Sequence, residues 1–365
     1  MKICIVSLCL TYGGAERVAV SWANSLSMLG HNVYMYADFT KECTYKLKDN
    51  VVKVQSIPIQ KLNLKAKISR FFRSFYDIYK LLNDNKPDIV ITINYLFALH
   101  LKVCMCFGYR CPILLTDHNA CQRPASAPMK LTLRFKKFVL SKYFDYMTVL
   151  TEVDRQICLE KGLKNVSVLY NPLFLEPIDI IPTKTKVILA VGRLDAWHYK
   201  GFDVLIKAWD AISDEFPEWI LKIVGAGGNN VVDQLYSFTK HKNQIQICPY
   251  TNDIEKYYID SSIFVLSSRY EGWGLVLVEA MSKGCAVIAC DYKGRQSEII
   301  TDGENGLLCE PENVDDLANK LYKLLANEKL RIRLQNNAPK AVERFSELKV
   351  GKNLEFIINK IIFSD

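Results

Sequence analysis

The chain has 365 residues, of which half are apolar and 24% are charged, and its formal net charge is +8. This length suggests two domains or one large one, and the composition excludes a mainly disordered chain. The positive charge belongs to the first half, because residues 1–181 hold 24 Lys and Arg against 14 Asp and Glu, whereas residues 182–365 hold 23 against 25. The first half is therefore expected to meet an anionic partner such as a membrane surface, a phosphate or a nucleic acid.

The twelve cysteines and the apolar tracts give further expectations. No CxxC pair occurs, so reduced, buried thiols in a cytoplasmic protein are favoured over a zinc site. The opening MKICIVSLCLTYGG lacks a basic stretch and a small-x-small cleavage site, and is predicted to be a buried strand rather than a signal peptide. The tract LFALHLKVCMCFGY is interrupted by His100 and Lys102, and is too short and too polar to span a bilayer.

Short apolar runs alternate with longer amphipathic segments along the first half. The predicted strands are KICIVSLCL, NVYMYA, VVKVQSI, DIVITIN, PILLTDH, YMTVLT and VSVLYN, and a helix is predicted at Ala15–Leu29 after the first of them. Such runs are typical of strands buried on both faces. With helices between them, they predict an α/β domain built on a doubly wound parallel sheet.

The segment NPLFLEPIDIIPTKTK (171–186) interrupts this pattern with three prolines and is the best linker candidate. After it the pattern restarts with VILAVG and a helix from Gly201 to Phe216, followed by ILKIVGAGG, QIQICPY, SIFVLSS and AVIACDY. The sequence thus predicts two similar domains, residues 1–180 and 181–349, and a last helix at about 350–365 that could pack on either.

Ligands of open α/β sheets bind beyond the carboxyl ends of the strands, so the strand-to-helix junctions should carry the chemistry. In LTYGGAER (10–17), Gly13 and Gly14 allow a tight turn before a helix whose free N–H groups suit an anion, although an ordinary glycine turn explains them equally well. In TDHN (116–119), His118 could bond a sugar hydroxyl or a phosphate, or stabilise developing charge; the alternative is a structural histidine.

The second half carries a cationic junction, VGRLDAWHYKGFDVLI (191–206). Arg193 follows the strand directly, and Lys200 precedes Gly201 and the next helix. Two cations with a glycine at a helix start suit a diphosphate, because arginine can fork onto two oxygens while lysine acts as a point charge. The alternative is a pair of solvated surface cations.

The segment RYEGWGLVLVEAM (269–281) places acids at both ends of an apolar run. Glu271 lies on the loop after a predicted strand, and Gly272 and Gly274 expose N–H groups at the start of the next helix, where an anion is favoured. Glu279 lies about one turn into that helix, where a carboxylate can accept both hydroxyls of a ribose. A solvated helix acid is the alternative for Glu279, and its apolar neighbours argue against it.

EGWGLVLVE, preceded by SSRY and followed by AMSKGCAVIAC, resembles the E-x7-E signature of the retaining family 4 glycosyltransferases with the GT-B fold, of the bacterial polysaccharide- and glycan-assembly type. VGRL…KG, GGAER and DYKGRQSEIITDGENGLLCEP resemble other stretches of the same family, in the same order. The resemblance implies two Rossmann-like domains facing across a cleft, a last helix that returns to the first domain, and no cofactor or metal. Trp273 stands where many members have Phe or another apolar residue, which leaves the transferred sugar open.

The resemblance also implies roles for individual residues. Arg193 and Lys200 would bind the donor diphosphate, and Glu279 the ribose. The sugar and phosphate would be held by Glu271 and the backbone of Gly272, Gly274, Leu275 and Val276. Gly13 and Gly14 would border the donor phosphate and the acceptor, His118 would contact the transferred sugar, and Tyr250 and Thr251 would pack the base. The residues expected to act in catalysis are Glu271, His118, Arg193 and Lys200.

The expected function is retaining transfer of a hexose or N-acetylhexosamine from a UDP-sugar to a glycan, such as a lipid-linked oligosaccharide. Basic segments with aromatics at 61–82 and 130–144 suit an anionic membrane surface on the cytoplasmic side, or else form a solvated face over an ordinary core. The alternatives are a nucleotide-sugar epimerase-like or phosphorylase enzyme on the same fold and a basic nucleic-acid-binding module. A dinucleotide oxidoreductase is disfavoured because neither half opens with GxGxxG.

Overall fold

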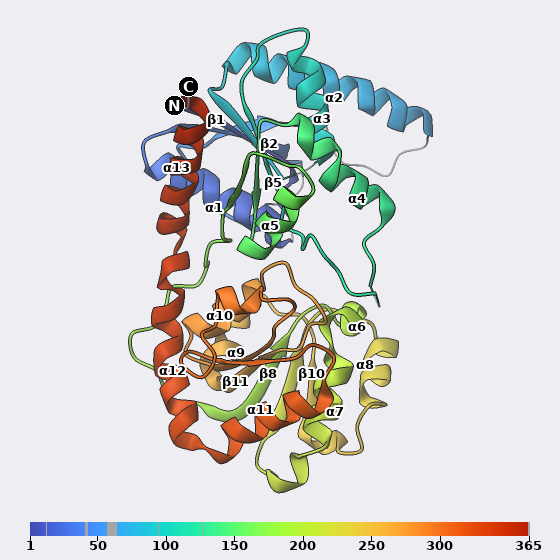
Figure 1. Cartoon of the computed structure of the whole chain (residues 1–365), viewed down its shortest axis with the longest axis vertical. Helices are drawn as coiled ribbons and strands as arrows, with labels where there is room; N and C mark the ends of the chain where they lie inside the picture. The colour runs from blue at the N-terminus through green and yellow to red at the C-terminus, as the bar shows by residue number, and fades with distance from the viewer. Residues whose placement is uncertain (12, 41–42, 57–63, 94, 126, 364–365) are drawn as a thin grey trace. The chain divides into compact units, whose positions relative to one another are not determined.

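The computed structural model describes the chain except residues 12, 41–42, 57–63, 94, 126 and 364–365, and except the side chains of residues 8, 64–72 and 96 (Figure 1). The chain divides into two compact units. The first unit comprises Met1–Gln122, Met129–Pro172 and Glu347–Asp365, and the second comprises Arg123–Pro128 and Leu173–Ser346.

The boundary between the units falls after Pro172, whereas the sequence suggested about residue 180. Residues 173–180 belong to the second unit because their backbone is bonded to it. The N–H of Leu173 donates to the carbonyl of Phe345 at 2.6 Å, and the N–H of Ile178 donates to the carbonyl of Ser282 at 3.0 Å. The ammonium of Lys283 donates to the carbonyl of Glu176 at 2.7 Å.

The first unit is built on a parallel sheet of seven strands in the order β3-β2-β1-β4-β5-β6-β7. Its strands are β1 (Lys2–Cys9), β2 (Asn32–Asp38), β3 (Val52–Gln55), β4 (Ile89–Thr92), β5 (Ile113–Thr116), β6 (Tyr146–Val149) and β7 (Val166–Val168). Its helices are α1 (Gly14–Met28), α2 (Leu64–Asn85), α3 (Tyr95–Met105), α4 (Leu131–Phe138), the 3-10 helix η1 (Leu140–Tyr143), α5 (Glu152–Glu160) and α13 (Glu347–Phe363).

The strands of the first unit form from apolar runs because both faces of the sheet are covered. All four residues of β4, β5 and β6 are buried. The last helix of the chain, α13, packs against α1, as Figure 1 shows. Ser25 Oγ of α1 donates to the carbonyl of Glu347 at 3.1 Å, and His31 Nε2 lies 2.7 Å from Glu355 Oε1.

The second unit holds a parallel sheet of six strands in the order β10-β9-β8-β11-β12-β13. Its strands are β8 (Thr185–Val191), β9 (Ile220–Val224), β10 (Ile245–Cys248), β11 (Ser261–Leu266), β12 (Ala286–Cys290) and β13 (Leu307–Cys309). Its α-helices are α6 (Trp197–Lys200), α7 (Phe202–Asp210), α8 (Asn229–Tyr236), α9 (Ile254–Asp260), α10 (Leu275–Ser282), α11 (Val314–Ala326) and α12 (Glu328–Val342).

These two sheets confirm the predicted fold class of two parallel-sheet α/β domains. Two local expectations differ from the structure. The helix expected from Gly201 to Phe216 ends at Asp210, and a 3-10 turn at Ser213–Glu215 follows it. The edge strand β13 was not predicted, because its three residues are too few to show a periodic pattern.

No helix among the described residues has an apolar stretch long enough to cross a bilayer.

Candidate active site

Glu271 is the centre of a polar cluster in the loop that follows β11. Its side chain is buried and accepts three hydrogen bonds. Lys200 Nζ lies 2.7 Å from Oε1, Ser268 Oγ lies 2.8 Å from the same oxygen, and Tyr199 OH lies 3.0 Å from Oε2. The carboxylate is therefore fixed in place by one cation and two hydroxyl groups.

Lys200 and Tyr199 reach this cluster from α6, which follows β8, the neighbour of β11 in the sheet. Gly201 ends that helix with a φ of 65°, and a Cβ at this position would lie 1.9 Å from the carbonyl oxygen of Ser267. Only glycine permits both the left-handed backbone and the close approach. The glycine thus brings the end of α6 directly against the loop that carries Glu271.

The hydroxyl of Tyr199 is protonated and donates a hydrogen bond to Glu271. Burial raises the pKa of its hydroxyl well above the ordinary value, and the adjacent charge of Glu271 raises it further. The tyrosine therefore stays protonated at neutral pH and donates to the carboxylate.

Arg269 anchors the same loop through ion pairs with Asp203 and Glu312. Its guanidinium donates to both carboxylate oxygens of Asp203 at 2.8 Å and to Glu312 Oε1 at 2.7 Å. The hydrogen bonds to Asp203 raise the pKa of Arg269; in turn, Arg269 lowers the pKa of Asp203 although burial opposes the shift. The backbone N–H of Arg269 also donates to the carbonyl of Tyr199 at 3.0 Å, which adds a backbone bond to the side-chain bonds that join Glu271 to α6.

Glu279 lies within α10, the helix that follows the loop of Glu271, and its side chain is buried. The hydroxyl of Tyr258, from α9, donates to Glu279 Oε2 at 3.2 Å. This bond holds the Glu279 carboxylate in place between α9 and α10. Gly274, with a φ of 97°, caps the start of this helix, and Leu275 and Val276 are its first two residues.

The other predicted donor-site residues of the second unit lie near the carboxyl ends of β8 and β10. The side chain of Arg193 is 73% exposed, and its described ion pair is with Asp195, at 3.8 Å, rather than with Glu271. Tyr250 is 55% exposed, and its hydroxyl donates to Asn252 Oδ1 at 2.8 Å. Thr251 Oγ1 accepts from the N–H of Asp253 at 3.0 Å.

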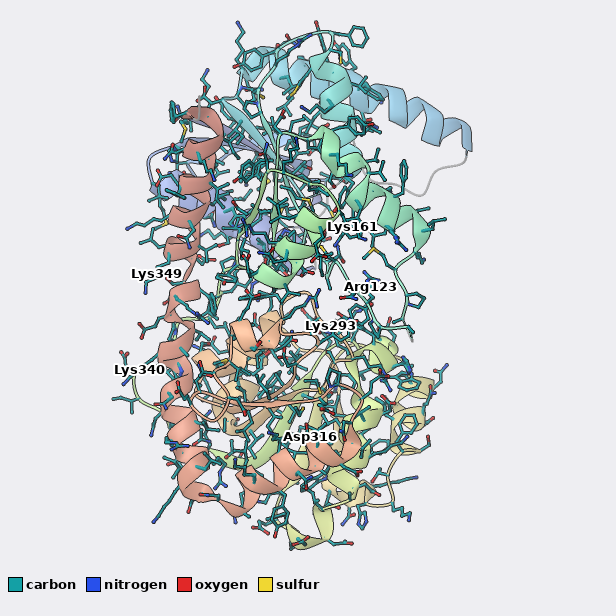
Figure 2. All side chains as sticks on the ribbon, viewed as in Figure 1. Arg123, Lys161, Lys293, Asp316, Lys340 and Lys349 are labelled. Atoms are coloured by element: carbon teal, nitrogen blue, oxygen red, sulfur yellow. The ribbon has the colours of Figure 1, made fainter. Side chains whose placement is uncertain are left out.

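Three tyrosines and one arginine form a group next to Glu271 that the sequence did not predict. The ring of Tyr270 lies 4.6 Å from that of Tyr199 and 6.2 Å from that of Tyr292. The guanidinium of Arg123, labelled in Figure 2, lies 5.2 Å from the centre of the Tyr270 ring. Arg123 belongs to the short segment Arg123–Pro128 that groups with the second unit although it is flanked on both sides by the first.

In the first unit, the predicted residues lie after β1 and β5. Gly13 is the N-cap of α1 and Gly14 is its first residue. His118, directly after β5, is partly buried, and its ring lies 5.6 Å from that of Trp22. His118 Nδ1 lies 3.1 Å from Asn171 Oδ1.

The environment of His118 sets its protonation state. Burial lowers the pKa of the imidazole, and the charge of Asp117 and the bond to Asn171 oppose this only in part. The ring is therefore neutral at pH 7. An amide oxygen can only accept, so Nδ1 carries the hydrogen, and Nε2 is an acceptor that lies 3.4 Å from the hydroxyl oxygen of Thr116.

A buried ion pair fixes the loop that carries His118. Lys137 Nζ lies 2.6 Å from Asp117 Oδ2, with the two side chains 0% and 1% exposed. Tyr95 OH also donates to Asp117 Oδ2 at 2.8 Å, and the N–H of Asn119 donates to Oδ1 at 2.9 Å. Lys137 was counted among the surface cations of 130–144; this is wrong, because the side chain points into the core to neutralise Asp117.

Two family models together match most of the chain. Residues 12–177 match the model described as Glycosyltransferase Family 4, and residues 175–341 match that described as Glycosyl transferases group 1. The chain belongs to the family 4-type glycosyltransferases. Membership favours a transferase over the epimerase-like enzyme and the nucleic-acid-binding module.

Individual relatives agree with this assignment. The chain is 28% identical, over 94% of each sequence, to a Campylobacter jejuni enzyme named GalNAc-alpha-(1->4)-GalNAc-alpha-(1->3)-diNAcBac-PP-undecaprenol alpha-1,4-N-acetyl-D-galactosaminyltransferase. Sucrose-phosphate synthase from Thermosynechococcus elongatus has the same fold, with a TM-score of 0.81 and 18% identity over 100% of both chains. The Anabaena HepE protein in complex with UDP-glucose is similar, with a TM-score of 0.75 and 16% identity over 99% of this chain and 100% of HepE.

Proposed function

We propose that this glycosyltransferase moves a hexose or an N-acetylhexosamine from a UDP-sugar to a lipid-linked oligosaccharide, with retention of the anomeric configuration and without a metal ion. The observation that carries the proposal is the cluster at Glu271. It combines a partly exposed cation, a fixed carboxylate and a helix start at the carboxyl ends of two neighbouring strands, β8 and β11.

Lys200 is suited to the donor diphosphate because it can serve two partners at once. Its ammonium group has three N–H donors, of which one is directed to Glu271. The other two can bind phosphate oxygens, and the exposed Arg193 adds a second cation. Together with the backbone N–H groups at the start of α10, these cations supply the charge that a metal ion would otherwise provide to the leaving group.

Glu279 is proposed to hold the ribose. A buried carboxylate on the helix that follows the Glu271 loop suits the two hydroxyls of a ribose, and the bond from Tyr258 holds it in place. Tyr250 and Thr251, after β10, would pack against the base. The bound UDP-glucose of the Anabaena HepE protein supports a uridine nucleotide, since that protein shares the fold.

The proposed chemistry is attack on the same face from which the diphosphate leaves. The bond from the anomeric carbon to the phosphate oxygen breaks, the acceptor hydroxyl forms a new bond on that face, and the departing phosphate oxygen takes the proton. Glu271 is a poor nucleophile for the alternative double displacement, because Lys200, Tyr199 and Ser268 already donate to three of its roughly four acceptor positions. Its role would be to accept hydrogen bonds from the sugar and to orient Lys200, while the neutral His118 accepts from another sugar hydroxyl.

The acceptor and the cellular location are part of the proposal. The Campylobacter jejuni relative is named for a diphospho-undecaprenol-linked substrate. The basic first half suits the same kind of acceptor, at the inner face of the cell membrane. Of the two basic segments predicted to meet the membrane, 130–144 is described, whereas in 61–82 residues 61–63 and the side chains of 64–72 lie outside the described part.

The proposal is tested by calorimetric titration with UDP, UMP, GDP and ADP, followed by turnover of UDP-sugars in the presence of EDTA. UDP is expected to bind most tightly, because the base, the ribose and the diphosphate each have a partner. Proton coupling constants of the product should show the same anomeric configuration as in the donor. Absence of UDP binding would overturn the donor assignment, an inverted anomer would overturn the retention, and loss of turnover in EDTA would overturn the metal independence.

A further inference from the structure

A row of apolar side chains lies exposed on the first unit, along α4 and η1. Its members occur at every fourth position, and they are Leu131, Phe135, Val139 and Tyr143, exposed by 79, 53, 41 and 71%. Residues four apart share one face of an α-helix, so Leu131 and Phe135 lie on one face of α4, while Val139 caps its end and Tyr143 ends η1. The inner face of the same helix carries Lys137, and Leu133 packs against a buried cluster. The exposed row is therefore a second apolar face on a helix whose inner face is already packed.

The first three members of this row line a hollow of about 350 Å³ with Phe138, Arg134, Lys142 and Lys161. An apolar floor with cations at its rim suits the chain of an amphiphile whose polar group is anionic. Of the 18 large apolar residues that are exposed in the described part of the chain, 14 belong to the first unit, so the row is part of a wider asymmetry.

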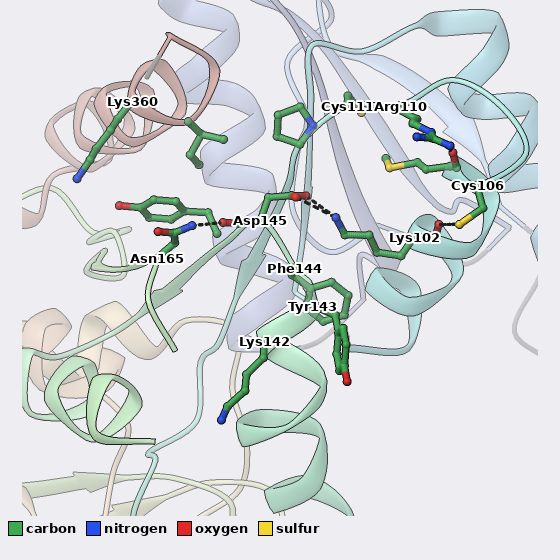
Figure 3. Close-up of a pocket in the computed structure, with 14 residues that line it drawn as sticks. Lys102, Cys106, Arg110, Cys111, Lys142, Tyr143, Phe144, Asp145, Asn165 and Lys360 are labelled. Atoms are coloured by element: carbon green, nitrogen blue, oxygen red, sulfur yellow. Dashed lines mark hydrogen bonds and ion pairs between the residues drawn. The ribbon is translucent and has the colours of Figure 1, made fainter. Parts of the chain in front are cut away.

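A second and larger hollow of about 980 Å³ adjoins the first, and Lys142 lines both. It lies at the amino ends of β5 and β6, where Pro112 and Asp145 precede the strands. Figure 3 shows Lys360 at one side of this hollow, Lys102 and Arg110 at the other, and Lys142 with Tyr143 at the lower rim.

The charge of this second hollow is strongly positive. Four cations and one carboxylate line it, for a formal balance of +3. The carboxylate, Asp145, is already engaged: Lys102 Nζ lies 2.9 Å from both its oxygens, and the N–H of Ile113 donates to Oδ2 at 2.9 Å. Asp145 therefore neutralises Lys102, and the remaining cations at the rim favour an anionic ligand.

We propose that the two hollows together form a binding site for an anionic phospholipid of the bilayer. The acyl chains lie against the exposed row of α4, Lys142 contacts the phosphate at the border, and the basic hollow receives the headgroup. The site is separate from the proposed reaction centre, because Gly13 and His118 lie at the opposite, carboxyl ends of the strands of the same sheet. The inference rests on the proposed attachment to a membrane, and it does not depend on the donor.

The test is flotation of the purified chain with vesicles of phosphatidylcholine, alone or mixed with phosphatidylglycerol. Binding is expected only to the mixed vesicles. Lys142→Glu should weaken it roughly tenfold, because each cation near an anionic surface favours binding by a few-fold and the substitution reverses one charge. Phe135→Ser should weaken it to a similar extent by removing apolar contact.

Lys349→Glu is the matched control, since Lys349 is an exposed residue of α13, labelled in Figure 2, and the change in net charge is the same. Equal weakening by Lys349→Glu would show unspecific attraction and overturn the site, as would failure of the unaltered chain to float with the mixed vesicles. Titration with glycerol 3-phosphate separates a lipid from a soluble phosphate. Tight binding of that compound without flotation would also overturn the lipid assignment.

UDP binding, measured on the same preparations, distinguishes this proposal from that of the reaction. Retained UDP binding in Lys142→Glu and Phe135→Ser would show that both variants fold, so that a loss of flotation reports on the lipid site. Flotation without UDP binding in the unaltered chain would leave the lipid site standing and overturn the donor assignment.

Discussion

Each unit holds a lysine–carboxylate ion pair just beyond the carboxyl end of a central strand, and the two pairs differ mainly in burial. In the first unit, Lys137 and Asp117 are 2.6 Å apart, and their side chains are 0% and 1% exposed. In the second unit, Lys200 and Glu271 are 2.7 Å apart, and their side chains are 18% and 11% exposed.

The partners of the two pairs explain what the difference means. Asp117 is bonded to Tyr95 and to its own loop, and Lys137 donates to the carbonyl of Asn119 at 2.6 Å. The partners of this pair lie within the first unit, and the pair holds the loop that follows β5 in place. Glu271 also accepts three hydrogen bonds from its neighbours, but Lys200 retains access to solvent and can turn toward an oxyanion. Burial thus separates a structural ion pair from one that is available to a ligand.

The largest expected effect is on stability, at the buried pair. Lys137→Met leaves Asp117 charged in the core, and should lower the free energy of unfolding by about 3–5 kcal/mol. Urea denaturation measures this loss. Lys136→Met, one residue away on the exposed face of α4, should change the free energy of unfolding by less than about 0.5 kcal/mol. Equal values for the two variants would show that the pair does not stabilise the loop.

The next largest effect is on turnover, at the accessible pair. Lys200→Ala removes a cation from the leaving group and should lower kcat by about 10²–10³-fold while the protein remains folded. Steady-state kinetics and a thermal melt test both parts. Lys186→Ala, at the amino end of β8 in an exposed ion pair with Glu218, is the control and should keep normal turnover. A near-normal kcat in Lys200→Ala would show that the ion pair of Lys200 and Glu271 has a structural role rather than a role in turnover.

A smaller effect is expected from the second acid of the E-x7-E motif. If Glu279 accepts the ribose hydroxyls, UDP should bind about tenfold more tightly than 2′-deoxy-UDP, since a hydrogen bond to a charged group contributes about 1.5 kcal/mol or more. Glu279→Gln should reduce this preference to roughly two- or threefold. Calorimetric titration of both nucleotides with both proteins measures it, and an unchanged preference in the variant would remove Glu279 from the ribose site.

The smallest effect is a pH dependence at His118. Its pKa is lowered in the folded chain, mainly by burial, so the unfolded chain binds more protons below about pH 6.5. Stability should therefore fall as the pH drops from 7.5 to 5, by no more than about 1.4 kcal/mol per pH unit for this one group.

His100, whose pKa burial also lowers, contributes in the same pH range. The difference between the unaltered chain and His118→Gln isolates the part due to His118. If denaturation midpoints of the two proteins fell in parallel between pH 7.5 and 5, His118 would not be the buried neutral group described above.

Much of the fold could be predicted from the local pattern of apolar residues in the sequence. Continuous apolar runs located β1, β5, β8 and β11 because strands buried on both faces need apolar residues at every position. The loop position of Glu271 and the helical position of Glu279 also followed, since a glycine pair separates the strand from the helix. These features depend on residues close together in the sequence, which is why the sequence could predict them.

The partners of the site could not be predicted in the same way. Arg269 and Asp203 are 66 residues apart, and Lys200 and Glu271 are 71 apart. Lys137 had the same local pattern as its exposed neighbours on α4, and only the packing of that helix shows that it meets Asp117. The sequence did not predict Arg123 as a residue of the site. Its contact with Tyr270 depends on the segment Arg123–Pro128, which groups with the second unit although the first unit flanks it in the sequence.

The sequence by itself determined the two parallel sheets, the family and the junctions where the candidate residues lie, because alternating apolar runs and glycine turns encode strands and the loops that follow them. The tertiary structure decided which charges are paired and how far each is buried, since both depend on side chains brought together from distant segments. Burial then fixes whether a lysine neutralises a core carboxylate, as Lys137 does, or remains available to an anion, as Lys200 does.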